Sequence, residues 1–199
     1  MGAPKFERHD LGISWLADSE EKMERASHAV ATPEGYWVID PVDVEGLDDE
    51  LAVLEDPLGV IQLLDRHARD CAAVADRLGV PHHEVPFDGI PDSPFETIEV
   101  VRNRLWNEVA LWWPEWNALI VAESVGSTGY FKAGDEAIGT HPAMRFKPPR
   151  ETLGSFEPEH LLTGHGTGMH GEGTAKALHD SLAGARKGIP KAILSLFRS

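Results

Sequence analysis

Cysteine and long apolar runs are almost absent from this sequence, and each absence excludes a class of protein. The 199 residues include a single cysteine, Cys71. An internal disulfide framework and a zinc site of several thiolates are therefore excluded, and a reducing compartment is indicated. No apolar run approaches the roughly 18 residues of a transmembrane helix. The N-terminal residues carry mixed charge without an apolar stretch, so we expect no secretory signal and a cytoplasmic location.

Positive charge is also scarce. Lysine and arginine number 18 against 33 aspartates and glutamates, which gives a formal net charge of −15. Such a surface repels phosphate backbones, so we expect no nucleic acid as partner, and no membrane either. The expected partner is a small molecule. A homodimer is expected if an exposed tryptophan supplies its interface. The tryptophans considered for this role are Trp106, Trp112, Trp113 and Trp116.

The apolar content, 42 % of the residues, suffices for one buried core. We predict a single domain over residues 1–199, with its core at about 12–190. Short β-branched and aromatic runs indicate strands, which we predict over 12–17, 36–40, 59–64, 82–86, 97–102, 108–113 and 118–122. Apolar residues at helical spacing indicate helices, which we predict over 48–54, 71–78 and 172–198, the last in two pieces with 191–197 as the second. This order indicates a layered α/β (α+β) domain.

Residues 124–149 differ from the rest of the chain because they are rich in glycine, proline and charge. This composition predicts a long irregular excursion. Long stretches without regular structure in a compact domain often serve a function, so we expect the excursion to cover a site.

Several short motifs occur in an order that resembles the metallo-β-lactamase superfamily. WVIDP at 37–41 precedes LLDRHARDC at 63–71, and a predicted helix then leads to GVP at 79–81. LLTGHG at 161–166 resembles the family's closing motif. In the family, the second segment reads His-x-His-x-Asp-His and binds two metal ions. The resemblance implies an αββα sandwich and a hydrolase-like protein.

The first of the family's two metal sites has no usable ligand here. The motif maps its positions onto Arg66, Ala68 and Arg104. An arginine side chain offers only hydrogen-bond donors and stays protonated. The resemblance therefore implies that this site is lost.

The second metal site keeps four side chains that can bind a borderline metal. They are Asp70, Cys71, Glu123 and His165, which offer carboxylate oxygen, thiolate sulfur and imidazole nitrogen. The resemblance thus implies at most one ion, zinc by its ligands, in a hydrolase of a small ester, lactone or amide. The candidate catalytic residues are His67, Asp70 and His165, with His67 at a spacer position of the motif.

A metal-free interpretation stays open beside this one. Asp70 suits a helix N-terminus without any metal, and Cys71 shares an apolar helical stripe with Val74. Arg66 and Arg69 would then replace the cation. In that case the three arginines Arg66, Arg69 and Arg104 would bind an anionic small molecule.

A third interpretation is a serine hydrolase. AESVG at 122–126 resembles a nucleophile elbow, with Ser124 as nucleophile and Asp135 and His165 as later partners. The glycines that follow make a poor helix start. The G-x-G-x-x-G pattern at 166–171 precedes helices alone and not a βαβ unit, so it does not indicate a dinucleotide site.

Overall fold

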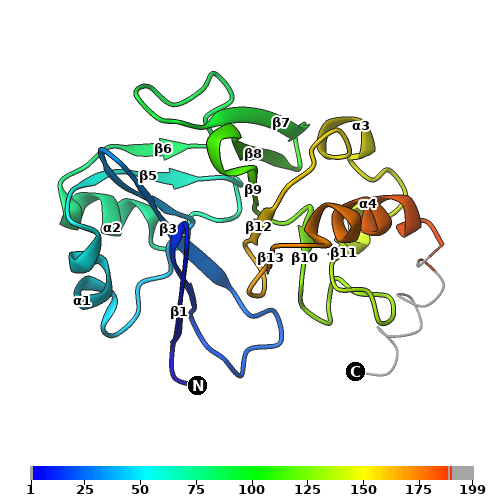
Figure 1. Cartoon of the computed structure of the whole chain (residues 1–199), viewed down its shortest axis with the longest axis horizontal. Coiled ribbons are helices and arrows are strands. Elements are labelled where there is room, and N and C mark those ends of the chain that lie inside the picture. The colour runs from blue at the N-terminus through cyan, green and yellow to red at the C-terminus, as the bar shows by residue number, and fades with distance from the viewer. Residues whose placement is uncertain (1, 188, 190–199) are drawn as a thin grey trace.

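The computed structural model describes residues 2–187 and 189, and its strands form two main sheets (Figure 1). The first sheet has the order β1-β2-β3-β4-β5-β6 and the second the order β13-β12-β9-β8-β7. The first comprises Lys5–His9, Gly12–Leu16, Ala26–Thr32, Gly35–Ile39, Pro57–Gln62 and His82–Glu84. The second comprises, from β7 to β9, Glu96–Arg102, Asn107–Trp113 and Ala118–Val121, with β12 at His160–Thr163 and β13 at Met169–His170.

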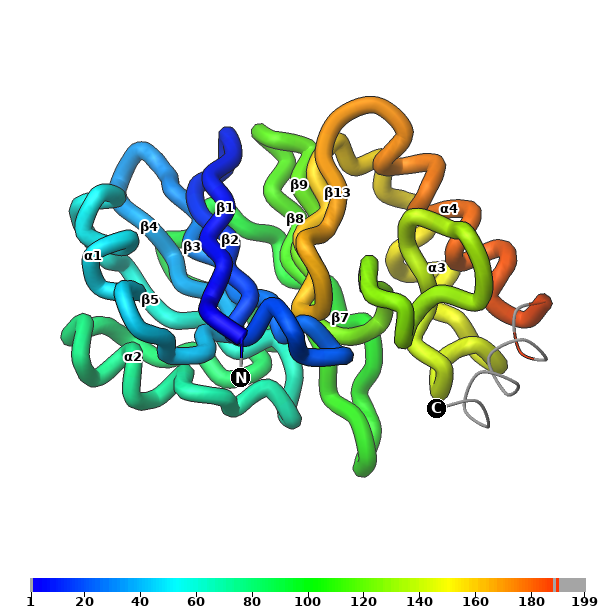
Figure 2. Tube along the Cα trace, turned by 90° about the horizontal axis from the view of Figure 1, so that it is seen from below, coloured from blue at the N-terminus to red at the C-terminus, as the bar shows by residue number. Residues whose placement is uncertain are grey.

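Among the described residues, α-helices cover the outer faces of the two sheets (Figures 1 and 2). Helices α1 (Leu47–Leu51) and α2 (Cys71–Leu78) pack on the first sheet. Helices α3 (Arg150–Leu153) and α4 (Thr174–Gly184) pack on the second. The result is the αββα sandwich that the family resemblance implied.

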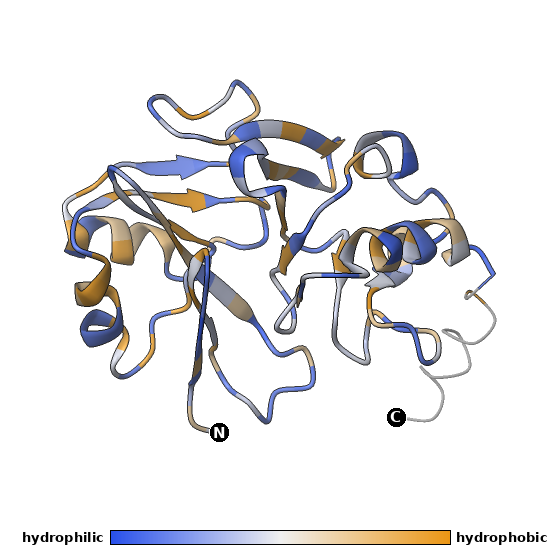
Figure 3. Ribbon diagram, viewed as in Figure 1, coloured by the Kyte–Doolittle hydropathy of each residue, from blue (hydrophilic) through white to orange (hydrophobic). Residues whose placement is uncertain are grey.

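Alternation of side chains along the strands explains the layers. Trp37 and Ile39 of β4 belong to the core between the two sheets, whereas Tyr36 and Val38 belong to the core under α1 and α2. Successive side chains of a strand point to opposite faces, so both faces of such a strand must be apolar. In Figure 3 the buried strand β5 is accordingly orange, whereas the edge strand β6 is largely blue.

The structure adds elements that the sequence patterns did not predict. Strand β1 carries Lys5, Glu7 and Arg8 at the edge of its sheet, and its side chains are largely exposed or half-buried. It therefore lacks the apolar alternation of a core strand. Within the predicted excursion, Val125–Gly126 (β10) pairs with Gly139–Thr140 (β11). A predicted helix over 191–197 lies outside the described residues. Among the described residues, no helix is both long and apolar enough to cross a membrane.

A buried histidine links the two sheets. His28 of β3 donates its Nε2–H to the carbonyl of Thr163 in β12 at 3.1 Å, and its side chain is 1 % exposed. Burial, aided by the nearby His9, lowers the pKa of His28 to about 3. The imidazole is therefore neutral in the folded protein across the physiological range.

We expect the free energy of unfolding to fall as the pH drops below about 6.5, the pKa of histidine in an unfolded chain. Below that value the unfolded chain takes up a proton that folded His28 refuses until about pH 3. The contribution of His28 to the free energy of unfolding is complete above pH 6.5. It falls by about 1.4 kcal/mol for each pH unit below that value. Urea unfolding between pH 7 and 5 measures the slope. The variant His28→Gln retains a donor for the Thr163 carbonyl. Its free energy of unfolding should depend less steeply on pH, by the uptake of one proton. An unchanged slope would assign the effect to other groups.

Candidate metal centre

Three side chains that commonly bind metals converge where strands of both sheets end. His67 follows β5, Glu123 follows β9, and His165 follows β12. Each offers one ligand atom, and these three atoms lie within 4.8 Å of one another. No other trio of such side chains among the described residues is this close. Strands β9 and β12 are parallel, so their carboxyl ends meet at the same edge. The fold thereby brings together residues that are far apart in the sequence.

Asp40 determines how His67 is oriented. The Nδ1 of His67 lies 2.7 Å from Asp40 Oδ2, and the backbone N–H of Leu63 donates to Asp40 Oδ1 at 2.8 Å. Burial opposes the charge on Asp40, but His67, Arg69 and the Leu63 N–H together lower its pKa. An ionised carboxylate accepts only, so Nδ1 carries the proton and Nε2 of His67 presents a lone pair.

The backbone orients His165 in the same way. Its Nδ1 lies 3.0 Å from the carbonyl oxygen of Met23, so Nδ1 carries the proton here too. Its Nε2 is buried and has no hydrogen-bond partner in the described part of the chain. Burial, with Arg69 and His67 nearby, lowers the pKa of His165 to about 4. The centre therefore contains a neutral imidazole whose lone pair is unmatched, and a buried unmatched group indicates a missing partner.

Glu123 supplies the carboxylate of the centre. Its Oε2 accepts a hydrogen bond from Arg66 at 2.9 Å, and its Oε1 lies 4.0 Å from His165 Nε2. Burial alone would raise the pKa of Glu123, but the Arg66 hydrogen bond and the imidazoles of His141 and His67 lower it. Glu123 is therefore ionised, with Oε1 directed towards the Nε2 atoms of His165 and His141.

A fourth imidazole, His141, stands beside the centre with its proton on the other nitrogen. Its Nδ1 accepts the backbone N–H of Ala143 at 3.2 Å, so Nε2 carries the proton. That nitrogen lies 3.7 Å from Glu123 Oε1. His141 is thus placed to donate towards Glu123 and has no lone pair to offer a cation there.

The excursion over 124–149 contributes this wall of the centre. Phe131 packs its ring 5.4 Å from that of His165 and 5.5 Å from that of His141. Trp106, from the turn between β7 and β8, lies 5.0 Å from His141 on another side. These aromatic rings exclude water from the imidazoles.

A buried acid, Glu108, forms the floor beneath Glu123. Its Oε1 accepts the backbone N–H groups of Glu123 and Ser124 at 3.0 and 2.9 Å, and its Oε2 accepts Trp106 Nε1–H at 2.8 Å. Burial raises the pKa of Glu108 despite these donors. The sequence analysis did not single out Glu108, which lies in an apolar strand and fixes the backbone at Glu123.

The glycines on either side of His165 are explained by how closely other parts of the chain approach them. A Cβ on Gly164 would lie 2.9 Å from Cε1 of His67 and 2.4 Å from the carbonyl oxygen of Ala122. Gly166 has φ +84°, a left-handed conformation that glycine adopts without strain. Both glycines are therefore needed for His165 to reach the centre.

The structure brings together only part of the metal set predicted from the sequence. Glu123 and His165 meet, but Asp70 turns away, because its Oδ2 accepts the backbone N–H of Asp43 at 2.8 Å. Cys71 is fully buried in the core under α2, and its Sγ lies 3.4 Å from the carbonyl oxygen of His67. Burial raises the pKa of the Cys71 thiol, which keeps it protonated.

The three arginines predicted to bind an anion occupy different surroundings. Arg69 donates to the carbonyl oxygens of Ala26, Asp40 and Gly164 at 2.6, 2.8 and 2.9 Å. Its Nη2, a hydrogen-bond donor, also lies 3.5 Å from Nε2 of His67. This contact is consistent with a lone pair on Nε2 of His67. Arg104 is exposed in the turn between β7 and β8.

Arg66 marks the exposed side of the centre. Its guanidinium lies 3.9 Å from the centre of the Trp106 ring, and it donates to the carbonyl of Leu105 at 3.1 Å and to Glu123. The side chain is 45 % exposed, so it lies between solvent and the imidazoles.

Ser124 lacks the neighbours that a serine nucleophile needs. It is fully buried, and its hydroxyl forms no hydrogen bond with an imidazole among the described residues. Asp135 is exposed in the excursion. A nucleophilic serine requires a base within hydrogen-bond reach, and none is placed there.

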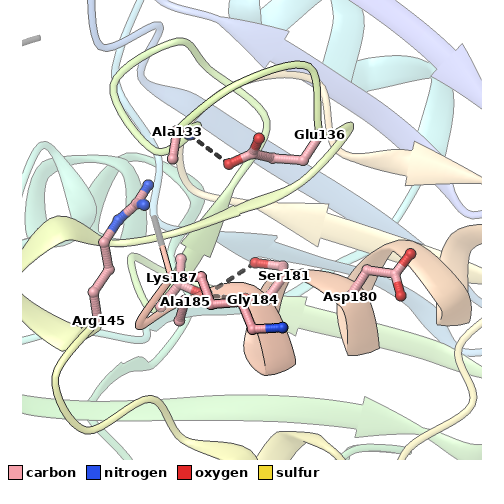
Figure 4. A pocket seen from close by; sticks show the side chains of 9 residues that line it. Ala133, Glu136, Arg145, Asp180, Ser181, Gly184, Ala185 and Lys187 are labelled. Atoms are coloured by element: carbon pink, nitrogen blue, oxygen red, sulfur yellow. Dashed lines mark hydrogen bonds between the residues drawn. The ribbon is translucent and has the colours of Figure 1, made fainter. Parts of the chain in front are cut away.

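A separate cavity lies between the excursion and α4 (Figure 4). It measures about 250 Å³, and Glu136, Arg145 and Ser181 are among the residues that line it. None of the three metal-binding candidates lines this cavity. The centre is therefore distinct from it.

One residue of the centre, His67, was not predicted as a ligand. The motif placed Arg66 at the first histidine position. If the motif is shifted by one residue, its first position falls on His67 and the others fall on Arg69, Cys71 and Ala72. Asp40, at the end of a strand in WVIDP, is the partner that would have favoured this register, because its carboxylate orients the imidazole.

No protein-family model and no curated protein matches the chain, but solved structures do. A DIM-1 metallo-β-lactamase exposed to ceftazidime is 12 % identical, with a TM-score of 0.63 over 92 % of this chain and 98 % of that one. FIM-1 from Pseudomonas aeruginosa, in a mono-zinc form, is 12 % identical with a TM-score of 0.57 over 92 % and 96 %. TTHA1623, in a di-iron-bound form, is 20 % identical with a TM-score of 0.51 over 75 % and 91 %.

Proposed function

Because this chain has the metallo-β-lactamase fold, we propose that it is a hydrolase of a small ester, lactone or amide. In this proposal one divalent metal ion, zinc by its ligand chemistry, is held by His67, Glu123 and His165. The observation that carries the proposal is the buried Nε2 of His165, a lone pair without a hydrogen-bond partner among the residues that the structure describes.

The donor set fits such an ion. Two imidazole nitrogens and one carboxylate oxygen make the His₂Glu combination found in catalytic zinc sites, where the fourth position stays open. Both imidazoles already donate their Nδ1–H groups, to Asp40 and to the Met23 carbonyl. Metal-binding histidines are usually oriented by such acceptors. When bound, the ion would polarise a carbonyl group and lower the pKa of water.

The residues around the centre have distinct tasks in this proposal. Asp40 holds the ring of His67, and Glu108 holds the backbone of Glu123. Phe131 and Trp106 keep bulk water away from the imidazoles. Arg66, stacked on Trp106 and half-exposed, holds the Glu123 carboxylate at the entrance.

The metal-free alternative needs guanidinium groups that are available to an anion. Arg69 already donates to three backbone carbonyls, and Arg66 to Glu123 and Leu105. An incoming anion would have to displace these bonds. This arrangement supports the hydrolase over a binding protein that relies on the arginines.

We expect chelation to abolish hydrolysis, and added zinc to restore it, because the His67 and His165 lone pairs have no other strong partner. The protein is prepared without an affinity tag, and a panel of chromogenic esters, lactones and anilides reports the rate. Metal content is measured on the same samples. Full activity in chelated protein without metal would contradict the proposal. Inhibition by a fluorophosphonate that Ser124→Ala abolishes would favour the serine hydrolase instead.

A further inference from the structure

A second group of imidazoles lies at the opposite end of β12 from His165. His9 ends β1, the edge of the first sheet, while His160 of β12 and His170 of β13 lie at the edge of the second sheet. The His170 ring centre is 4.9 Å from that of His9 and 5.2 Å from that of His160. The two sheet edges lie beside each other in Figure 2, so this histidine trio joins them.

A chain of hydrogen bonds fixes the tautomer of His9. His28 must donate its Nε2–H to the Thr163 carbonyl, so its Nδ1 accepts the hydroxyl of Ser14 at 2.7 Å. The Ser14 oxygen then accepts the Nε2–H of His9 at 2.8 Å. His9 Nδ1 is therefore a lone pair, and it is buried without a hydrogen-bond partner.

This is the same signature that His165 shows in the candidate centre. A buried acceptor without a donor is costly and calls for an ion or a water. Its neighbours His160 and His170 face each other through their Nδ1 atoms at 2.9 Å, so one Nδ1 donates its proton to the lone pair of the other, and a cation held by both nitrogens would replace that proton.

We propose that His9, His160 and His170 form a second metal site, for a borderline divalent cation such as Zn²⁺ or Ni²⁺. Imidazole nitrogen is the ligand that these cations favour. Two nitrogens on one tetrahedral zinc lie about 3.3 Å apart, so the His160–His170 pair needs little movement. The nitrogens of the three rings do not all lie within 4.8 Å of one another, so His9 must turn its ring towards the pair when a cation binds. Asp10 and Glu7 add negative charge at the rings of the trio.

The site would act as a clamp between the two sheet edges. A cation that binds only the folded chain stabilises it by mass action. This role needs no catalytic activity, so it stands apart from the proposed hydrolase.

Metal binding by His165→Ala tests the proposal, because that substitution disables the His67–Glu123–His165 centre. The untagged chelated variant is dialysed against Ni²⁺ or Zn²⁺, and bound metal is counted. We expect His165→Ala to bind one equivalent of metal. A second substitution, His170→Asn, should abolish this binding, whereas His179→Gln should leave it unchanged. His179 is a matched control on α4, where its Nε2 lies 2.9 Å from the carbonyl of Phe156. Bound Cu²⁺ should show nitrogen splitting that His170→Asn removes.

Thermal unfolding provides the second readout. Nickel should raise Tm of His165→Ala and leave Tm of the His165→Ala/His170→Asn variant unchanged. Unfolding of the chelated variants checks that His170→Asn still folds, and His160→Gln serves in its place if it does not. No bound metal in His165→Ala, or the same binding with and without the trio substitutions, would overturn the proposal.

Discussion

His165→Ala is expected to lose the metal equivalent bound at the candidate centre and to reduce kcat/KM by at least about 100-fold. Loss of a residue that only orients a ligand costs about 10–100-fold in affinity or activity, so removal of a ligand should reach or exceed the upper end. His165 contributes a buried lone pair whose ring is fixed by the Met23 carbonyl. Metal analysis and steady-state kinetics on the same preparation check both effects.

Two further substitutions make this expectation specific. Asp40→Asn keeps the size of the side chain but removes the charge that orients His67, so metal affinity should fall by about 10–100-fold with the stoichiometry intact at saturation. His141→Gln should keep the bound equivalent, because His141 Nε2 carries a proton and is not a ligand. Loss of metal in His141→Gln but not in His165→Ala would show that the tautomers are assigned to the wrong rings.

Arg69→Met is expected to destabilise the fold by about 3–5 kcal/mol, because it removes three hydrogen bonds from a charged donor, which contribute about 1.5–3 kcal/mol each. The guanidinium joins the carbonyl oxygens of Ala26, Asp40 and Gly164. Its removal breaks this three-way link, although the Asp40 and Gly164 carbonyls keep the Ser27 hydroxyl and the Ala26 N–H as donors. For a chain of this length the loss corresponds to a fall in Tm of about 10 °C. Urea and thermal unfolding of chelated protein measure it without any contribution from bound metal.

Arg66→Met is the matched control for that substitution. Arg66 is three residues away and forms an ion pair with Glu123, but it is 45 % exposed. Exposed ion pairs contribute about 0–1 kcal/mol, so this variant should unfold close to the wild type. Equal stability of Arg66→Met and Arg69→Met would refute the structural role given to Arg69.

The layered fold was predictable because several strands have apolar side chains on both faces. Trp37 and Val38, on opposite faces of β4, are both buried, and such runs leave a clear signal in the sequence. Strand β1 left no such signal, because an edge strand needs backbone partners on one side only and can expose charged side chains. Strand β13 is too short for any periodicity.

The centre was predictable only where a motif fixed the register. Glu123 and His165 each follow a strand with a recognisable ending, and both were proposed as ligands. His67 was assigned to a spacer because Arg66 occupied the expected histidine position. The contact between His67 and Asp40 places His67 in the centre. Because these residues follow different strands, patterns of neighbouring residues in the sequence do not indicate this contact. Cys71 was ambiguous because a buried thiol and a ligand thiolate have the same spacing.

The positions of the three candidate ligands have a kinetic consequence. His67, Glu123 and His165 come from loops that follow β5, β9 and β12, so the centre forms only after segments about a hundred residues apart along the chain have docked. Contacts of such long range form slowly because loop closure must precede them. Metal capture at this centre would therefore mark the late, rate-limiting docking of the two halves, and a coloured ion such as Co²⁺ would report that step in a refolding experiment.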